Sequence, residues 1–245
     1  MKAMIFAAGL GTRLRPYTND KPKALVAVNG TPMLGLLLGL LERQGIDFVV
    51  INVHHYAEKI VDYVKNLRKN LKMEIHISDE SDFLLDTGGG LLKAKKYFLE
   101  GEPFLVHNVD VISEINFQEL LNEHQKNGNA VTLAVRNRKT SRYFLFDSSH
   151  RLCGWKNMKS NEIKIPCRPE GKMFSLAFSG IQIIDPLIFN YMDKQGKFSI
   201  TNFYIDLAAK EKIGCYRHDD TFWMDLGTIE KLDEASKYLK STDYE

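Results

Sequence analysis

The sequence lacks most of the features that would set it apart from an ordinary globular protein. Its three cysteines, Cys153, Cys167 and Cys215, are an odd number without C-x-x-C spacing, so neither a disulfide framework nor a zinc site is expected. No apolar stretch approaches the roughly 20 residues of a membrane-spanning helix. The apolar run at 3–8 is too short for a signal peptide. These absences predict a cytoplasmic protein without a membrane partner.

An excess of charge of one sign is also missing. The chain carries 33 lysines and arginines against 31 aspartates and glutamates, a formal net charge of +2 at pH 7. This balance gives no reason to expect nucleic acid as the main partner, so any basic feature that matters must be local. With 245 residues, 44% of them hydrophobic, the chain can bury a substantial core.

Strand-like and helix-like patterns alternate through the first half of the chain. This alternation is typical of a Rossmann-like, doubly wound α/β fold, in which a mainly parallel sheet is covered by helices and loops gather at the carboxyl ends of the strands. The expected strands are 3–8, 48–53, 73–77, 103–106 and 130–135, and the expected helices are 32–44, 57–69, 89–98 and 116–126.

After about residue 137 the pattern changes to shorter strands separated by polar loops. No Ser/Gly-rich linker separates the halves, so 1–245 is expected to be one domain, with a core at 1–137 and a smaller substrate-binding extension at 138–245. The expected strands are 143–146, 151–155, 163–165 and 175–184, and the expected helices are 186–192, 201–210 and 229–239.

The first expected strand runs into a glycine loop, "AAGLGTRLRPYTNDKPKAL". Gly9 and Gly11 allow the backbone to approach a phosphate chain, although the same pair could form a bare structural turn. Arg13 and Lys23 favour the phosphate, because a guanidinium forks onto phosphate oxygens and an ammonium acts as a mobile point charge. The loop therefore indicates a polyphosphate that is held and reacted.

Two better-known phosphate motifs are excluded by the residues that follow. A dinucleotide fingerprint would need a third glycine, but Leu14 stands there and Pro16 follows. A P-loop would need G-K followed by Ser or Thr, which is absent.

Two aspartates lie where strands are expected to end. Asp110 follows the apolar strand of "PFLVHNVDVIS", and Asp225 lies in "FWMDLGT" before the last helix. Each could be a turn or cap residue. Carboxylates at strand ends point into the crevice where α/β sheets bind ligands, and Mg²⁺ on a triphosphate needs only one or two of them. Together the pair predicts a magnesium site.

With these pieces in order, the chain closely resembles the sugar-1-phosphate nucleotidyltransferases. The matching stretches are the glycine loop, "NVD" at 108–110, "FSGI" at 178–181 and "WMDLGT" at 223–228. The resemblance implies a GT-A-like fold and the attack of a sugar-1-phosphate on the α-phosphorus of a nucleoside triphosphate, with loss of pyrophosphate. Substrates rather than macromolecules would be the partners, and the protein would be a monomer or small homo-oligomer.

The resemblance also implies roles for individual residues. Arg13, Lys23 and Asp110 would be catalytic, with Lys23 on the α-phosphate, and Asp110 and Asp225 would bind Mg²⁺. The implied nucleotide contacts come from Ala8, Gly9, Gly11, Thr12, Arg13, Glu80, Thr87, Gly88 and Asn108. No general base is expected, because the attacking phosphate oxygen is already an anion.

The sequence leaves the substrates open. A carboxylate such as Glu80 accepts the N3–H of uracil as well as the N1–H and N2–H of guanine. "TGGG" at 87–90 is most similar to the loop of N-acetylmuramate-1-phosphate uridylyltransferases of cell-wall recycling. The "AAG" start is more similar to the uridylyl- and thymidylyltransferases than to the guanylyltransferases, and UTP is the expected donor. Mannose- or heptose-1-phosphate guanylyltransferases and choline-phosphate cytidylyltransferases are alternatives.

The sugar contacts are less well defined. Ser179 and Gly180 belong to a retained motif and are expected to line the sugar pocket. The Glu-Lys pair that grips the sugar in many relatives is replaced by Gly154-Trp155-Lys156-Asn157, where Lys156 could meet a sugar carboxylate or be a plain surface lysine. A metal-dependent glycosyltransferase would be expected to carry Asp-x-Asp, and a non-catalytic sensor could lose Lys23 or Asp225. Neither departure is found.

Overall fold

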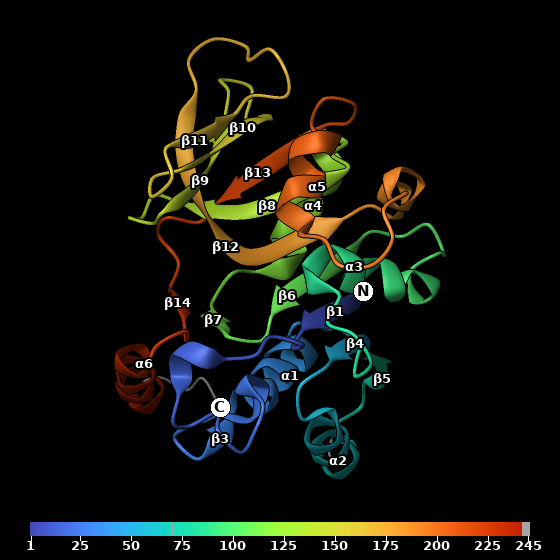
Figure 1. Cartoon of the computed structure of the whole chain (residues 1–245), viewed down its shortest axis with the longest axis vertical. Coiled ribbons are helices and arrows are strands. Elements are labelled where there is room, and N and C mark those ends of the chain that lie inside the picture. Colours follow the sequence, from blue (N-terminus) through green and yellow to red (C-terminus); the bar gives the residue numbers. More distant parts are fainter. Residues whose placement is uncertain (70, 242–245) are drawn as a thin grey trace. The chain divides into compact units, whose positions relative to one another are not determined.

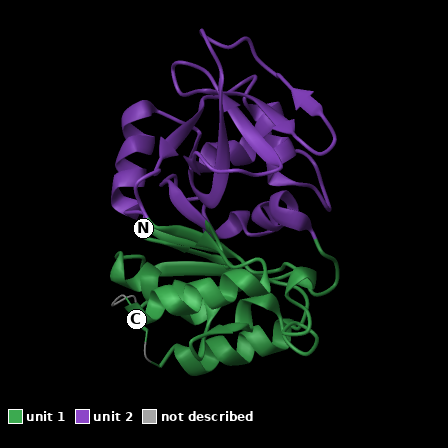
Figure 2. Cartoon of the chain, turned by 90° about the vertical axis from the view of Figure 1, so that its left-hand side faces the viewer, with its two compact units in different colours: residues 1–84, 107–114, 222–245 green, residues 85–106, 115–221 purple. Residues whose placement is uncertain are grey.

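The computed structural model describes residues 1–69 and 71–241, which form two compact units (Figure 1, Figure 2). Unit 1 contains 1–84, 107–114 and 222–241, and unit 2 contains 85–106 and 115–221. Each unit is thus assembled from segments that are distant in the sequence. Neither unit has a boundary at residue 137, so the separate roles expected for 1–137 and 138–245 stay predictions.

Unit 1 is an α/β unit with a parallel sheet. Its elements are β1 (Lys2–Phe6), η1 (Thr12–Leu14), η2 (Lys23–Leu25), β2 (Ala27–Val28), β3 (Thr31–Pro32), α1 (Met33–Arg43), β4 (Phe48–Val53), α2 (Ala57–Leu67), β5 (Glu74–Asp79), β7 (Val111–Ser113), β14 (Trp223–Asp225) and α6 (Ile229–Ser241). β1 pairs with β4 and β4 with β5, all in parallel. These are the first three strands that the alternating pattern predicted.

The helices of unit 1 follow from their apolar faces. α1 begins directly after Pro32 and buries Leu34, Leu37, Leu38 and Leu41, which recur at helical spacing. α2 packs on β5, and α6 packs on β2 and β14. β14 pairs antiparallel with β7, which brings the last strand of the chain beside residues 111–113. This second, small sheet positions the acidic residues described below.

Unit 2 has a mixed sheet. Its elements are α3 (Asp86–Lys93), η3 (Lys95–Tyr97), α4 (Phe117–Asn127), β8 (Val131–Arg136), β9 (Arg142–Phe146), β10 (Leu152–Asn157), β11 (Glu162–Lys164), β12 (Phe174–Ile184), η4 (Pro186–Tyr191), α5 (Ile200–Leu207) and β13 (Ile213–Arg217). β6 (Phe104–Asn108) carries the chain from unit 2 into unit 1. The fold class is the α/β class that the sequence predicted.

In unit 2 the long strand β12 joins two parts of the sheet. It pairs antiparallel with β8 and with β9, β8 pairs parallel with β13, and β9 and β11 flank β10 in antiparallel register. α4 packs on β8, β12 and β13, whereas α5 packs on α3 and β10. The side chain of Asn116 caps α4 by accepting the amides of Gln118 at 2.9 Å and Glu119 at 3.1 Å.

Two sequence expectations differ from the structure in detail, and one strand was not expected. The helix expected at 89–98 begins at Asp86 and ends at Lys93, so the glycine run lies inside it. The segment at 186–191 is a 3₁₀ helix, and β13 is a strand that the sequence did not reveal.

Within 1–69 and 71–241, no helix combines the length and the apolar character that crossing a membrane requires.

Candidate active site

The two units divide the residues expected at the site. Unit 1 holds Ala8, Gly9, Gly11, Thr12, Arg13, Lys23, Glu80, Asn108, Asp110 and Asp225, and unit 2 holds Thr87, Gly88, Lys156, Ser179 and Gly180. The expected phosphate and metal residues therefore share one unit.

The glycine loop leaves β1 and turns through the 3₁₀ helix η1. Gly11 has a φ of +63°, a left-handed conformation that favours glycine. A Cβ at this position would lie 2.9 Å from Cβ of Lys23 and 3.1 Å from Cγ2 of Thr18. The Gly11 carbonyl accepts the Leu14 amide at 2.9 Å and the Thr18 hydroxyl at 3.0 Å. Leu14 is fully buried, whereas Arg13 is exposed, so the loop is anchored on one side and offers its cation on the other.

Lys23 forms an ion pair with Asp110 between Nζ and Oδ2. Only 11% of the lysine side chain and 21% of the aspartate side chain are exposed, so solvent screens this pair less than a surface pair. The Val109 amide donates to the Phe6 carbonyl at 3.2 Å, which holds the end of β6 beside the end of β1. The ion pair of Lys23 with Asp110 thus joins the glycine loop to the first of the two expected metal aspartates.

Asp225 is brought to the same place by the small sheet. It lies opposite Val111 in the β7–β14 pair, and the Leu226 amide donates to the Asp110 carbonyl at 2.7 Å. The backbones of the two aspartates are therefore neighbours, although Asp110 and Asp225 are 115 positions apart in the sequence. This confirms that residue 225 belongs to a strand leading into the last helix.

Both carboxylate oxygens of Asp225 have donors. Oδ1 accepts the Gly227 amide at 3.1 Å, and Oδ2 accepts Nζ of Lys231 at 2.6 Å from the first turn of α6. A Cβ on Gly227 would lie 2.7 Å from Oδ1 of Asp225 and 2.9 Å from Nη2 of Arg13. Gly227 is thus required for the close approach of the arginine to the Asp225 turn.

A cavity of about 340 Å³ opens at this loop. It is lined by Gly9, Leu10, Gly11, Thr12, Arg13, Leu14, Lys23 and Gly227. Two cationic side chains and a glycine-rich backbone make this lining suited to an anion with several phosphate groups.

Glu80 directly follows β5 and has no exposed surface. Its carboxylate accepts Nδ2 of Asn52 at 2.7 Å, and Oδ1 of the same asparagine accepts the Ala7 amide at 2.8 Å. Asn52, which the sequence reasoning missed, therefore links the ends of β1, β4 and β5. The sequence marks Asn52 only as the polar residue within the apolar run "FVVINV".

In unit 2, Thr87 and Gly88 lie in the first turn of α3. The Thr87 amide donates to Oδ1 of Asp86 at 2.6 Å, and the Gly88 amide donates to the Phe198 carbonyl at 2.9 Å. A Cβ on Gly88 would come within 2.4 Å of the Phe198 ring. The glycine run therefore has a packing reason, and both amides have partners within the chain. Their contact with a base stays a prediction.

Ser179 and Gly180 lie at a β-bulge of β12, where the register with β8 shifts between Phe178 and Gln182. The Ser179 hydroxyl is buried and lies 2.6 Å from Nε2 of His218. Thr221 donates its hydroxyl to the His218 carbonyl, so Nδ1 of His218 donates to Oγ1 of Thr221 at 3.0 Å and Nε2 accepts from Ser179.

His218 is held neutral by its surroundings. Burial, followed by the nearby Arg136, lowers the pKa of its imidazole to about 4. Ser179 therefore supports the shape of the bulge, and its contact with a sugar stays a prediction. Lys156 is half-buried in β10, with its ammonium 5.3 Å from the centre of the Tyr143 ring.

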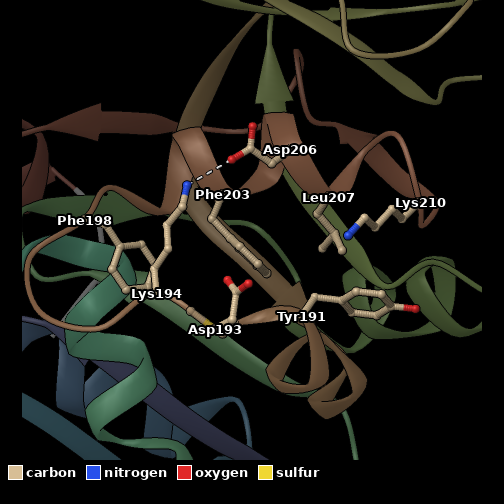
Figure 3. A pocket seen from close by; sticks show the side chains of 9 residues that line it. Tyr191, Asp193, Lys194, Phe198, Phe203, Asp206, Leu207 and Lys210 are labelled. Carbon is tan, nitrogen blue, oxygen red and sulfur yellow. Dashed lines mark hydrogen bonds and ion pairs between the residues drawn. The ribbon is translucent and has the colours of Figure 1, made fainter.

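A second cavity, of about 220 Å³, lies in unit 2 between η4 and α5. Figure 3 shows Phe203 among the side chains that line it, together with the ion pair of Lys194 and Asp206, which is 3.1 Å long. None of the residues that the sequence predicted for the site lines this cavity.

Comparison with known proteins decides the family. The model of the family described as nucleotidyl transferase matches residues 2–242. The chain belongs to the nucleotidyl transferase family. It is 31% identical over 231 residues to the N-acetylmuramate alpha-1-phosphate uridylyltransferase of Caulobacter vibrioides, covering 92% of this chain and 91% of that protein.

A second relative has a different substrate in its name. The chain is 28% identical over 227 residues to the catalytic subunit beta of mannose-1-phosphate guanylyltransferase from Dictyostelium discoideum, covering 93% of this chain. It spans only 61% of that protein. Among solved structures, a UDP-glucose pyrophosphorylase complexed with UDP-glucose has the same fold, with a TM-score of 0.76 at 18% identity over 98% of this chain and 99% of that one.

The donor set of unit 1 fits the divalent metal expected for a nucleotidyl transferase. No three His, Cys, Asp or Glu side chains gather as a metal cage in the described part of the chain. Mg²⁺ on a triphosphate needs no such cage, since one or two carboxylates suffice beside phosphate oxygens and water. Asp110 and Asp225 supply two carboxylates on adjacent backbones, and each is paired with a lysine.

Two residues that contact the expected site residues were not found from the sequence. Lys231 lies six residues beyond Asp225, and Gly227 stood out only as part of the stretch "WMDLGT". A lysine in the first turn of a helix gives no signal by itself, because such residues are commonly solvated. Only the folded chain shows that Lys231 contacts Asp225.

Proposed function

We propose that the chain transfers the nucleotidyl group of a nucleoside triphosphate to a sugar-1-phosphate and releases pyrophosphate. The observation that carries the proposal is the ion pair of Lys23 with Asp110 at a cavity lined by the glycine loop. A triphosphate would bind Lys23 and a divalent cation would bind Asp110, so each ligand would replace one partner of this ion pair. Family membership supports the same reaction class.

The chemistry follows from the charges. An oxygen of the sugar-1-phosphate attacks the α-phosphorus, and the bond from that phosphorus to the bridging oxygen of the β-phosphate breaks. The attacking oxygen is already anionic, so no proton has to be removed from it. Catalysis then rests on positioning and on neutralising the phosphates. Lys23 would contact the α-phosphate, and Arg13 would stabilise the departing pyrophosphate.

Mg²⁺ would be held by Asp110 and Asp225, and it would neutralise charge on the phosphates when bound. The protein's part is to present the two carboxylates on paired strands. The nucleotide would contact residues of the glycine loop and of the end of β6, namely Ala8, Gly9, Gly11, Thr12 and Asn108.

For the donor we favour UTP, and for the acceptor N-acetylmuramate-1-phosphate. The support is the match to a uridylyltransferase over 91% of that protein's length, together with the glycine run at 88–90. Glu80 could accept the N3–H of uracil if its carboxylate exchanged Asn52 for the base. In unit 2, Ser179 and Gly180 would line the sugar pocket, and Lys156 would pair with the lactyl carboxylate. A cytoplasmic role in cell-wall recycling would follow.

A second candidate is mannose-1-phosphate guanylyltransferase. The Dictyostelium relative favours it, because that match covers 93% of this chain. Glu80 does not discriminate, since guanine also presents N–H donors to a carboxylate.

The two candidates are separated by measuring pyrophosphate release. UTP, dTTP, GTP, CTP and ATP are each combined with N-acetylmuramate-, mannose-, heptose-, glucose- and N-acetylglucosamine-1-phosphate, and with phosphocholine. Highest turnover with UTP and N-acetylmuramate-1-phosphate supports the favoured assignment. Highest turnover with GTP and mannose-1-phosphate replaces it by the second candidate.

A further inference from the structure

Each carboxylate expected to bind metal is held by a lysine of the same unit. Asp110 is paired with Lys23, and Asp225 is paired with Lys231. Lys23 already has a place in the reaction through its expected contact with the α-phosphate. Lys231 has no such place, and nothing in the sequence had marked it.

The Lys231 contact competes directly for a ligand oxygen. Its Nζ lies 2.6 Å from Oδ2 of Asp225, while the Gly227 amide donates to Oδ1 at 3.1 Å. Both oxygens of this carboxylate are therefore engaged by donors of the chain. A cation that binds Asp225 through Oδ2 has to displace an ammonium group that is part of the protein.

The exposure of the pair sets the strength of this competition. The side chains of Lys231 and Asp225 are 36% and 27% exposed. Solvent therefore reaches the pair and weakens it, so that a divalent ion with a triphosphate can displace the lysine. An ion without the triphosphate brings only its own charge against the ammonium of Lys231 and, at Asp110, that of Lys23.

We infer that Lys231 is a positioning residue that holds the Asp225 carboxylate and lowers the divalent-metal affinity of the free enzyme. The carboxylate pair then takes up its metal together with the triphosphate rather than before it. This inference rests on the proposed function, because it assumes that Asp110 and Asp225 are the metal ligands.

The test is Mn²⁺ binding to the protein without any substrate, measured by electron paramagnetic resonance. In Lys231→Met the Kd for Mn²⁺ should fall about threefold to tenfold, because a cation beside the ligand oxygen is removed. Lys231→Arg keeps the charge and should stay within about twofold of the wild type. The gain should shrink in 0.5 M KCl, where the Debye length is only several ångströms.

A matched control separates this effect from a change in net charge. Lys237→Met removes an exposed lysine from the same helix and should leave the Mn²⁺ affinity unchanged. The gain should also disappear in the double variant Asp225→Asn/Lys231→Met. Circular dichroism checks that each variant is folded, and Lys231→Gln replaces Lys231→Met if the apolar side chain disturbs folding.

The possible outcomes distinguish a failure of the role of Lys231 from a failure of the proposed function. Unchanged Mn²⁺ affinity in Lys231→Met, or an equal gain in Lys237→Met, rejects the role of Lys231 while pyrophosphate release by the wild type stands. A gain that persists in the double variant rejects Asp225 as the residue through which Lys231 acts. Absence of pyrophosphate release by the wild type, with the Mn²⁺ gain intact, rejects the proposed reaction alone.

Discussion

Lys23 and Asp110, 87 residues apart in the sequence, form an ion pair between the glycine loop and the end of β6. The pair is mostly shielded from solvent, so each charge depends on the other for its neutralisation. A phosphate group at Lys23 and a divalent cation at Asp110 would together replace both partners. Substitutions of Lys23 or Asp110 should therefore lower turnover more than substitutions of other residues of the glycine loop.

Asp110→Asn should abolish metal-dependent pyrophosphate release, lowering kcat by about 10³-fold or more, because a neutral amide cannot neutralise the metal or order it on the phosphates. Steady-state kinetics over a range of Mg²⁺ concentrations measure this. Turnover within about tenfold of the wild type at saturating Mg²⁺ would remove Asp110 from the metal site.

Lys23→Ala should lower kcat about 10²-fold and raise the KM for the triphosphate by much less. The reason is that the ammonium is expected to act on the α-phosphate where charge develops, while Arg13 and the backbone continue to bind the nucleotide. The comparison needs kcat and KM determined separately. A large rise in KM with kcat unchanged would assign Lys23 to binding alone.

Gly227→Ala should lower turnover by about tenfold or more while leaving the fold intact. The added Cβ would lie 2.7 Å from Oδ1 of Asp225 and 2.9 Å from Nη2 of Arg13, so one of the two side chains must move. Gly39→Ala is the matched control in the same unit, because its Cβ would meet only Nη1 of Arg43 at 3.6 Å. Equal activity of both variants with the wild type would show that the Arg13 position is unimportant.

The free energy of unfolding should fall as the pH drops from about 6.5 toward 4. Burial lowers the pKa of His124 from 6.5 to about 4. The unfolded state therefore takes up a proton in this range before the native state does, and the native state loses stability as the pH falls. The same shift holds for His107 and His218.

His124→Gln should make this pH dependence shallower, with a difference from the wild type of up to about 2 kcal/mol between pH 7 and pH 5. Urea denaturation at the two pH values measures it, and His55→Gln, at an exposed position, is the control. An identical pH dependence in His124→Gln and the wild type would refute the buried neutral imidazole.

The structural features that the sequence could predict are those encoded by residues close together in the chain. β1, β4 and β5 alternate with α1 and α2 along the chain. Strand-like and helix-like sequence patterns alternate in the same order, so the parallel sheet of unit 1 could be predicted. The glycine loop was also readable, because Gly11 needs its left-handed backbone and Arg13 stands beside it. Strand ends mark Asp110 and Asp225 in the same way.

The remaining features depend on contacts between distant segments. Lys231 and Gly227 become meaningful only when β14 pairs with β7 and carries Asp225 to Asp110. Glu80 was expected to contact a base, but its buried carboxylate accepts from Asn52, which lies on β4 and is 28 residues away in the sequence. The division into two interleaved units is likewise invisible in a linear pattern, since segments such as 107–114 are too short to show where they pack.

The most direct test of the central claim is pyrophosphate release from UTP and N-acetylmuramate-1-phosphate by the wild-type chain with Mg²⁺, beside the variant Asp110→Asn. The account predicts stoichiometric formation of pyrophosphate and the UDP-sugar by the wild type and essentially none by the variant. The absence of pyrophosphate with every nucleoside triphosphate and sugar-1-phosphate pair, from a folded wild-type protein, would contradict it.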